Sequence, residues 1–307
     1  MSLPVHNSVL VVDRFLVYRP QVRLHECFAE AVFRADLGCL SHDFLPTIAL
    51  QYGDVAGSFE FTDGIGQLHP LTEHTDQVAV NFVDLAAEFE MRLRKAGGEG
   101  YVRMRAFNQE LFQGLAVSGD HGCTPGFFDG AVTGSGMSKA SPHGASEKTI
   151  NRGEAILIDY TGVFDGYILD MTRMFVIGNL APDLQQAFDT ALAIQAAIAE
   201  AMQPGAICAE IFGLAEQMAT NAGLGSCFMG APGEQAKFVG HGVGLELDEM
   251  PVLAKGFNVP LQLNQTIAVE PKFVFPGSGV VGIENTFVVS KDGGERLTTL
   301  NDALIVL

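Results

Sequence analysis

The stretch of residues 155–178 constrains the fold of this chain more than any other part of the sequence. It contains two β-branched and aromatic runs around an Asp-Gly pair, AILIDYTGVFDGYILDMTRMFVIG, a pattern typical of a β-hairpin. Each arm carries one aspartate, Asp159 or Asp170, in an apolar run. A turn centred between Phe164 and Asp165 would place the two carboxylates directly opposite, and a turn centred on the Asp-Gly pair would leave them diagonal. In both registers they share one face of the hairpin.

Two like charges at this separation repel, and burying them unpaired is costly. A positive partner is therefore expected between Asp159 and Asp170, and a divalent metal bound by oxygen ligands would supply it. The hairpin alone leaves an alternative open, in which one aspartate faces solvent and the other caps a turn.

Charge and composition exclude several classes of function. Among the 307 residues, 18 Lys and Arg stand against 36 Asp and Glu, and the net charge of −18 argues against binding to nucleic-acid phosphates or to anionic membranes. No apolar run approaches the roughly 18–20 residues that span a bilayer, and the chain begins without the basic region of a signal peptide, so a cytoplasmic location is expected.

The 5 cysteines include no Cys-x-x-Cys pair, which argues against a disulfide framework or a zinc knuckle. We expect most of them to be small buried hydrophobes. Their spacing leaves open a catalytic cysteine that works with His121 or His143.

Periodicity predicts helices over residues 84–96, 182–203 and about 206–222, and strands over 101–107, 266–271 and 280–290. Seven glycines between 114 and 136 predict a loop. Aligning the ends of the first and third helices gives an offset of 126, which suggests a weak internal duplication. The counterpart of the helix at 182–203 would fall at 56–77, where glycines and a proline make a helix improbable. We assign no function to residues 1–80. The elements expected there are a strand at Val9–Val12 and a helix at Gln21–Leu37.

Three further polar residues stand in apolar or glycine-rich surroundings in the last third of the chain. His241 lies between glycines in FVGHGVG, Glu270 interrupts the apolar run TIAVEP, and Glu284 interrupts VVGIENTFVVS. Two Asp, two Glu and one imidazole can hold two divalent cations with bridging carboxylates and a bridging water. Such a centre lowers the pKa of that water and polarises a carbonyl, which predicts hydrolysis of an amide or ester by a two-metal-activated hydroxide.

From about Phe82 to Leu307, the order and spacing of four motifs resemble the pita-bread metallopeptidases, which include Xaa-Pro aminopeptidases, prolidases, methionine aminopeptidases and creatinase. The motifs are LIDYTGVFDGYILDMTRMF, FVGHGVGLELDEMPVL, AVEPKFVFPG and GIENTFVV. The resemblance implies an α+β pita-bread fold, with two pseudo-symmetric αβ halves around a curved antiparallel sheet. The expected domains are an atypical N-terminal region at 1–80 and a catalytic domain at 81–307.

The resemblance also implies roles for individual residues. The implied ligands of two divalent metal ions, Mn²⁺ or Co²⁺, are Asp159, Asp170, His241, Glu270 and Glu284. Glu270 matches the ligand that also serves as general base, and Glu284 matches the bridging ligand. His143 resembles the histidine that contacts substrate and assists proton transfer. The implied substrate is a peptide with an Xaa-Pro bond, cleaved by an aminopeptidase or a dipeptidase, and family members are often homodimers.

Three positions depart from the family pattern. Asp248 stands where the peptidases usually have a second histidine near the scissile bond, and is the candidate for substrate binding; an ionised aspartate cannot donate a hydrogen bond to an oxyanion. Lys272 replaces a usual glycine after Glu-Pro, and Asn285 a usual aspartate after Glu284. Two other functions therefore remain open: a catalytically silent binding module and a creatinase-like C–N hydrolase that works without metals.

Overall fold

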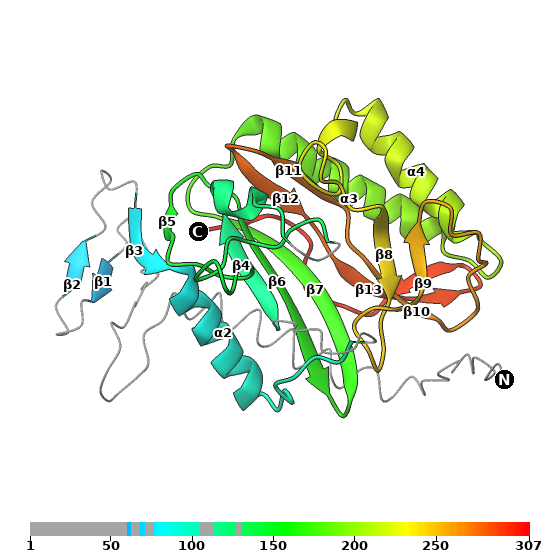
Figure 1. Ribbon diagram of the computed structural model, residues 1–307, viewed down its shortest axis with the longest axis horizontal. Helices are drawn as coiled ribbons and strands as arrows, with labels where there is room; N and C mark the ends of the chain where they lie inside the picture. The colour runs from blue at the N-terminus through cyan, green and yellow to red at the C-terminus, as the bar shows by residue number, and fades with distance from the viewer. Residues whose placement is uncertain (1–59, 63–67, 71–76, 105–112, 127–129) are drawn as a thin grey trace.

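The computed structural model describes residues 60–62, 68–70, 77–104, 113–126 and 130–307 (Figure 1). The strand expected at Val9–Val12 and the helix expected at Gln21–Leu37 lie outside these ranges. The division into 1–80 and 81–307 therefore stays a prediction.

Three α-helices, two 3-10 helices and fifteen strands make up the described chain. The α-helices are α2 (Phe82–Lys95), α3 (Pro182–Ala201) and α4 (Cys208–Asn221), and the 3-10 helices are η1 (Gly119–Cys123) and η2 (Gly225–Cys227). The strands are β1 (Glu60–Thr62), β2 (Leu68–Pro70), β3 (Gln77–Asn81), β4 (Gly114–Ser118), β5 (Thr149–Asn151), β6 (Ile156–Phe164), β7 (Tyr167–Val176), β8 (Phe238–Gly242), β9 (Glu249–Ala254), β10 (Thr266–Val269), β11 (Lys272–Phe275), β12 (Gly279–Gly282), β13 (Asn285–Ser290), β14 (Gly293–Arg296) and β15 (Ile305–Val306). None of the described helices is both long enough and apolar enough to cross a bilayer.

The predicted hairpin forms as β6 and β7, and its register is the diagonal one. Asp159 pairs with Thr172, and Thr161 pairs with Asp170. The turn residues Asp165 and Gly166 have φ angles of 51° and 81°, the left-handed conformation that a two-residue hairpin turn of type I′ requires. The twist of this turn matches that of the strands, which explains why it is centred on the Asp-Gly pair.

A second hairpin carries the two glutamates. Strand β10 pairs with β13 from Thr266 opposite Val288, and β11 pairs with β12 from Lys272 opposite Gly282. The residue numbers of every pair in both ladders add to the same value, so the register continues across the gap between them. It places Glu270 opposite Glu284 on one face.

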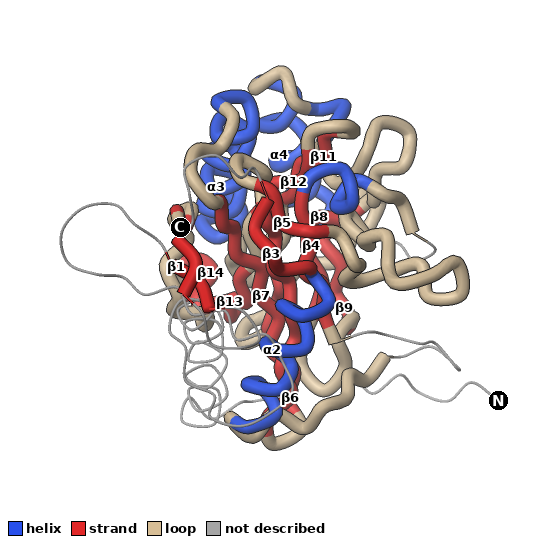
Figure 2. The backbone as a smooth tube through the Cα atoms, turned by 90° about the vertical axis from the view of Figure 1, so that its left-hand side faces the viewer, coloured by secondary structure: helices blue, strands red, loops and turns tan. Residues whose placement is uncertain are grey.

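The two hairpins join into one curved sheet at the isolated antiparallel bridge between Thr172 and Glu284 (Figure 1). On one side of this bridge the strand order is β15-β7-β6-β4, and on the other it is β14-β13-β10-β8-β9. The outer face of β6 and β7 packs against α2 through Ile158, Tyr160 and Phe89, whereas Ile267 and Val269 belong to a cluster shared with α3 and α4. Figure 2 shows the strands between α2 and the pair α3 and α4.

The duplication predicted from the helix ends is visible in the structure. Helices α2 and α4 have the same length of 14 residues, and their first residues, Phe82 and Cys208, differ by the predicted offset of 126. The described residues of the segment 56–77 form short strands and no helix. These features confirm the α+β architecture with two related halves around an antiparallel sheet.

Two local predictions were wrong. The strand expected at 101–107 is irregular over 101–104, because Arg103 bonds to the loop after β8: its carbonyl accepts from Leu247 N and its side chain donates to Leu245 O at 2.6 Å. The remainder of that strand lies outside the described residues.

The loop expected at 114–136 begins with strand β4, which pairs with β6. A Cβ at Gly114 would lie 2.4 Å from the Tyr160 ring, so this glycine permits close approach of two strands.

Candidate metal centre

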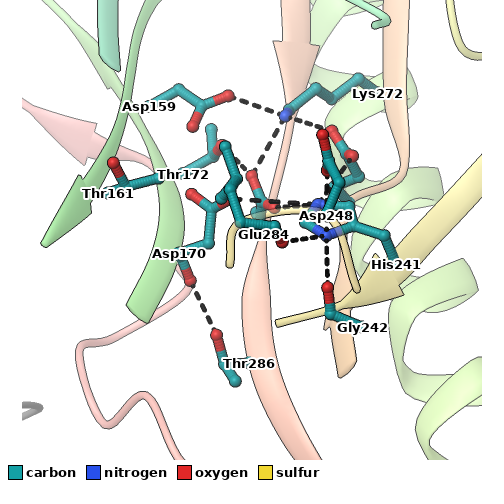
Figure 3. Close-up of polar contacts among 12 residues, drawn as sticks. Asp159, Thr161, Asp170, Thr172, His241, Gly242, Asp248, Lys272, Glu284 and Thr286 are labelled. Atoms are coloured by element: carbon teal, nitrogen blue, oxygen red, sulfur yellow. Dashed lines mark hydrogen bonds and ion pairs between the residues drawn. The ribbon is translucent and has the colours of Figure 1, made fainter. Parts of the chain in front are cut away.

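All five residues predicted as metal ligands lie on one face of the curved sheet. Asp159 pairs with Thr172, Thr172 bridges to Glu284, and Glu284 lies opposite Glu270. His241 in β8 pairs with Ala268, two residues before Glu270. Paired residues, and residues two apart on one strand, point to the same side, so alternation alone brings side chains from five separate segments together. Figure 3 shows the resulting cluster.

One part of the cluster suits a metal ion. Ligand atoms of Asp170, His241 and Glu284 lie within 4.8 Å of one another, and all three side chains are buried. His241 Nε2 lies 3.9 Å from Asp170 Oδ2 and 4.0 Å from Glu284 Oε1. In addition, Asp170 Oδ1 and Glu284 Oε1 are buried without a hydrogen-bond partner. Buried carboxylate oxygens need such a partner, and a divalent ion between them would satisfy both.

In the other part of the cluster, the ammonium group of Lys272 lies among the carboxylates (Figure 3). Its Nζ donates to Asp159 Oδ2 at 2.8 Å, to Glu270 Oε2 at 2.7 Å and to Glu284 Oε2 at 3.1 Å. Thr172 Oγ1 donates to the same Glu284 oxygen at 2.9 Å. Three of the five predicted ligands therefore already have a cationic partner from the chain itself.

The electrostatics of the cluster reflect crowded negative charge. Burial, and then the charges of Glu284 and Asp159, raise the pKa of Asp170 well above its usual value. Burial also raises the pKa of Asp159 and of Glu284, although Lys272 opposes this in both cases. Burial alone would lower the pKa of Lys272, but the surrounding carboxylates raise it well above its usual value. The site therefore favours a charged ammonium and still has too little positive charge around Asp170.

His241 is held with one ring nitrogen facing the carboxylates. Its Nδ1 lies 3.0 Å from Leu247 O and 3.1 Å from Gly242 O, so the tautomer with a proton on Nδ1 leaves Nε2 free to bind a metal. Asp248 Oδ1 lies 3.4 Å from the same Nδ1. Burial lowers the pKa of His241, but the charges of Asp248, Glu270 and Glu284 outweigh this and raise it.

The two residues predicted to touch substrate have different surroundings. Half of the Asp248 side chain is exposed, beside His241 at the edge of the cluster. His143 is half-buried in the segment between Ser141 and β5. Their roles toward substrate stay predictions.

Among the cysteines that the structure describes, Cys123, which lies two residues from His121, gives no support to a catalytic cysteine. Burial raises the pKa of Cys123 to about 11, so its nucleophilic thiolate is scarce at neutral pH. The nearby His121 is engaged elsewhere, because its Nδ1 lies 2.9 Å from both Ser146 Oγ and Ser135 Oγ.

Sequence reasoning missed a buried residue that positions Glu284. Arg173 is fully buried, and its guanidinium donates to Glu284 O at 2.8 Å and to Asn285 Oδ1 at 2.8 Å. Asn285, which departs from the family pattern, therefore belongs to this supporting network behind the site. A charged residue in an otherwise apolar strand was the available signal for Arg173. For Lys272 the signal was its position two residues after Glu270, which places both side chains on one face.

Comparison with known proteins agrees with this geometry. The family model for metallopeptidase family M24 matches residues 77–291. The Xaa-Pro dipeptidase of Pyrococcus furiosus is 31% identical over 175 residues, 57% of this chain and 48% of that protein. The Xaa-Pro dipeptidase of Lactobacillus delbrueckii subsp. lactis is 27% identical over 258 residues, 84% of this chain and 67% of that protein. The chain spans about half the length of the Pyrococcus relative.

Solved structures show the same fold. An X-Pro aminopeptidase from Thermotoga maritima superposes with a TM-score of 0.67 at 22% identity, covering 95% of this chain and 61% of that one. A Xaa-Pro dipeptidase from Bacillus anthracis gives a TM-score of 0.60 at 28% identity, covering 74% of this chain and 55% of that one. The predicted pita-bread fold is confirmed, and the chain belongs to metallopeptidase family M24, a family of metal-dependent hydrolases.

Proposed function

We propose that this chain is a metal-dependent peptidase that hydrolyses Xaa-Pro bonds, as an aminopeptidase or a dipeptidase. The observation that carries the proposal is the buried group formed by Asp170, His241 and Glu284, in which two carboxylate oxygens have no other partner. Support for the substrate class comes from the relatives, whose names describe Xaa-Pro dipeptidases.

The residues of the site have distinct roles in this proposal. Asp170, Glu284 and His241 Nε2 hold a divalent ion, Mn²⁺ or Co²⁺, which supplies Lewis-acid chemistry at the scissile carbonyl when bound. Glu270 Oε1 lies 3.6 Å from His241 Nε2, beside that position, where it accepts a proton as general base. Asp248 and His143 contact the substrate, and His143 assists proton transfer to the departing proline nitrogen.

The test is release of proline from Ala-Pro and of alanine from Ala-Pro-Ala, after loading the protein with Mn²⁺ or Co²⁺. We expect release that chelation abolishes and metal restores, and no release by the Asp170→Ala variant. Ala-Ala and Ala-Ala-Ala are the matched substrates without proline, and we expect slower cleavage of both. Cleavage of Ala-Ala and Ala-Ala-Ala as fast as Ala-Pro and Ala-Pro-Ala would contradict the proposed specificity for proline. Full activity without bound metal would contradict the proposed metal dependence.

A catalytically silent binding module is the second candidate, and one observation favours it. Lys272 neutralises part of the negative charge of Asp159, Glu270 and Glu284. These buried carboxylates therefore stabilise the fold through an ion pair with the chain itself, and this role needs no catalysis. A protein that binds metal at Asp170 but releases no product from any Xaa-Pro peptide would support this function. The same assay therefore separates the two candidates.

A further inference from the structure

The ammonium group of Lys272 has the coordination expected of a bound cation. Its Nζ lies 2.7–3.1 Å from one oxygen of each of Asp159, Glu270 and Glu284. An ammonium has three donors, so these three carboxylates use its full hydrogen-bonding capacity. A divalent ion bound to the same three oxygens at about 2.0–2.6 Å would fall in the volume that Nζ takes.

The stem of Lys272 fixes the ammonium at this place. Lys272 lies opposite Gly282 in the β11–β12 ladder, and its side chain is only 3% exposed. A Cβ added to Gly282 would lie 2.5 Å from Lys272 Cγ, so the stem runs over the bare backbone of this glycine. The side chain is therefore packed in a slot of the sheet that leads to the carboxylates.

Two carboxylates connect the ammonium with the metal position. Glu284 directs Oε2 to Lys272, while its Oε1 lies 4.0 Å from His241 Nε2. Glu270 does the same, with Oε2 on Lys272 and Oε1 at 3.6 Å from His241 Nε2. The cluster thus has two neighbouring cation positions that share Glu284, with Glu270 beside both, and the Lys272 ammonium fills one of them.

We propose that this chain binds one divalent ion, held by Asp170, His241 and Glu284, and that the Lys272 ammonium takes the place of a second ion. The proposal deepens the proposed function, on which it rests for the remaining metal. It differs from the pair of ions predicted from the sequence. A second divalent ion would have to displace a buried ammonium from three carboxylates and would meet its repulsion at short range.

Metal content tests the proposal directly. The protein is equilibrated with excess Mn²⁺, and separately with Co²⁺, freed of unbound metal by gel filtration, and analysed by elemental mass spectrometry. We expect about one ion per chain in the wild type and about two in Lys272→Ala, which frees three carboxylates for a second ion. Lys255→Ala is the matched control, because the Lys255 side chain is 71% exposed in an ion pair with Glu216. It should keep the wild-type content.

A thermal shift supplies a second readout that does not depend on turnover. Without metal, Lys272→Ala should melt below the wild type because its carboxylates lose their cation, and saturating Mn²⁺ should raise its melting temperature more than that of the wild type. Wild-type protein with two ions, or with none, would overturn the proposal. So would a well-folded Lys272→Ala that still binds one ion. If the variant does not fold, the wild-type content alone decides.

The outcome also separates this proposal from the proposed peptidase activity. One ion per wild-type chain without product release would uphold the role of Lys272 and contradict the peptidase function. Two ions per wild-type chain with product release would do the reverse.

Discussion

Replacement of Arg173 should destabilise the fold severely, because its guanidinium joins the site to the C-terminal segment. Its five hydrogen bonds reach Thr172 O, Glu284 O, Asn285 Oδ1, Leu300 O and Asn301 O, at 2.7–3.0 Å. It also forms an ion pair with Asp302 at 3.2 Å. Burial lowers the pKa of Arg173 to about 10, with Asp302 opposing this shift, so the group stays charged at neutral pH.

The magnitude follows from these contacts. Hydrogen bonds to a charged group contribute about 1.5–3 kcal/mol each, but such values are not additive. Arg173→Met leaves several carbonyl oxygens around the buried guanidinium without this donor, at about 1–3 kcal/mol each and not additively, so the expected loss is about 3–5 kcal/mol. Since domains are typically stable by about 5–15 kcal/mol, the variant should lose a large part of its stability.

Urea denaturation followed by circular dichroism measures this loss, and a second arginine provides the control. Arg296 pairs with the same Asp302, but its side chain is 36% exposed, so Arg296→Met should cost no more than about 1 kcal/mol. In addition, Arg173→Met should bind Mn²⁺ more weakly, because the Glu284 carbonyl loses the shorter of its two hydrogen bonds and keeps only the one from Thr172 N. Equal free energies of unfolding for the two variants would refute the role assigned to Arg173.

Three further predictions concern the surroundings of the site. Asp248→Asn should weaken Mn²⁺ binding about 10-fold, measured by titration calorimetry, because the carboxylate beside His241 supports the ligand; unchanged affinity would contradict this. Cys123 should react with iodoacetamide at pH 8 at least about 100-fold more slowly in the folded protein than in urea, as peptide mass spectrometry would show, since a pKa of about 11 leaves few thiolates. Burial disfavours the Glu154 carboxylate, but hydrogen bonds led by that from Lys148 outweigh it and lower its pKa. Glu154→Gln should therefore cost about 1 kcal/mol at pH 7, and the difference should shrink as pH falls below about 4.5; a loss that is independent of pH would argue against the carboxylate.

Sequence alone was sufficient for the elements with strong local signals. The Asp-Gly pair in the hairpin at 155–178 and the apolar periods of the helices are short-range features, and they predicted β6, β7, α3 and α4 close to their observed bounds. The offset of 126 between helix ends, another pattern within the chain, predicted the two related halves. The five ligand candidates could also be named, because charged residues in apolar strands stand out from their neighbours.

Tertiary structure decided what those ligands bind. The choice between an opposite and a diagonal Asp159–Asp170 pair depended on the turn, and the meeting of Glu284 with Thr172 depended on how two distant hairpins join. The second of these contacts connects residues more than a hundred positions apart, and no local pattern encodes it. The sequence identified Lys272 only as a departure from a family pattern. Folding brought its ammonium within hydrogen-bonding distance of three carboxylates, because strand alternation and the bare backbone of Gly282 direct its stem into the metal cluster.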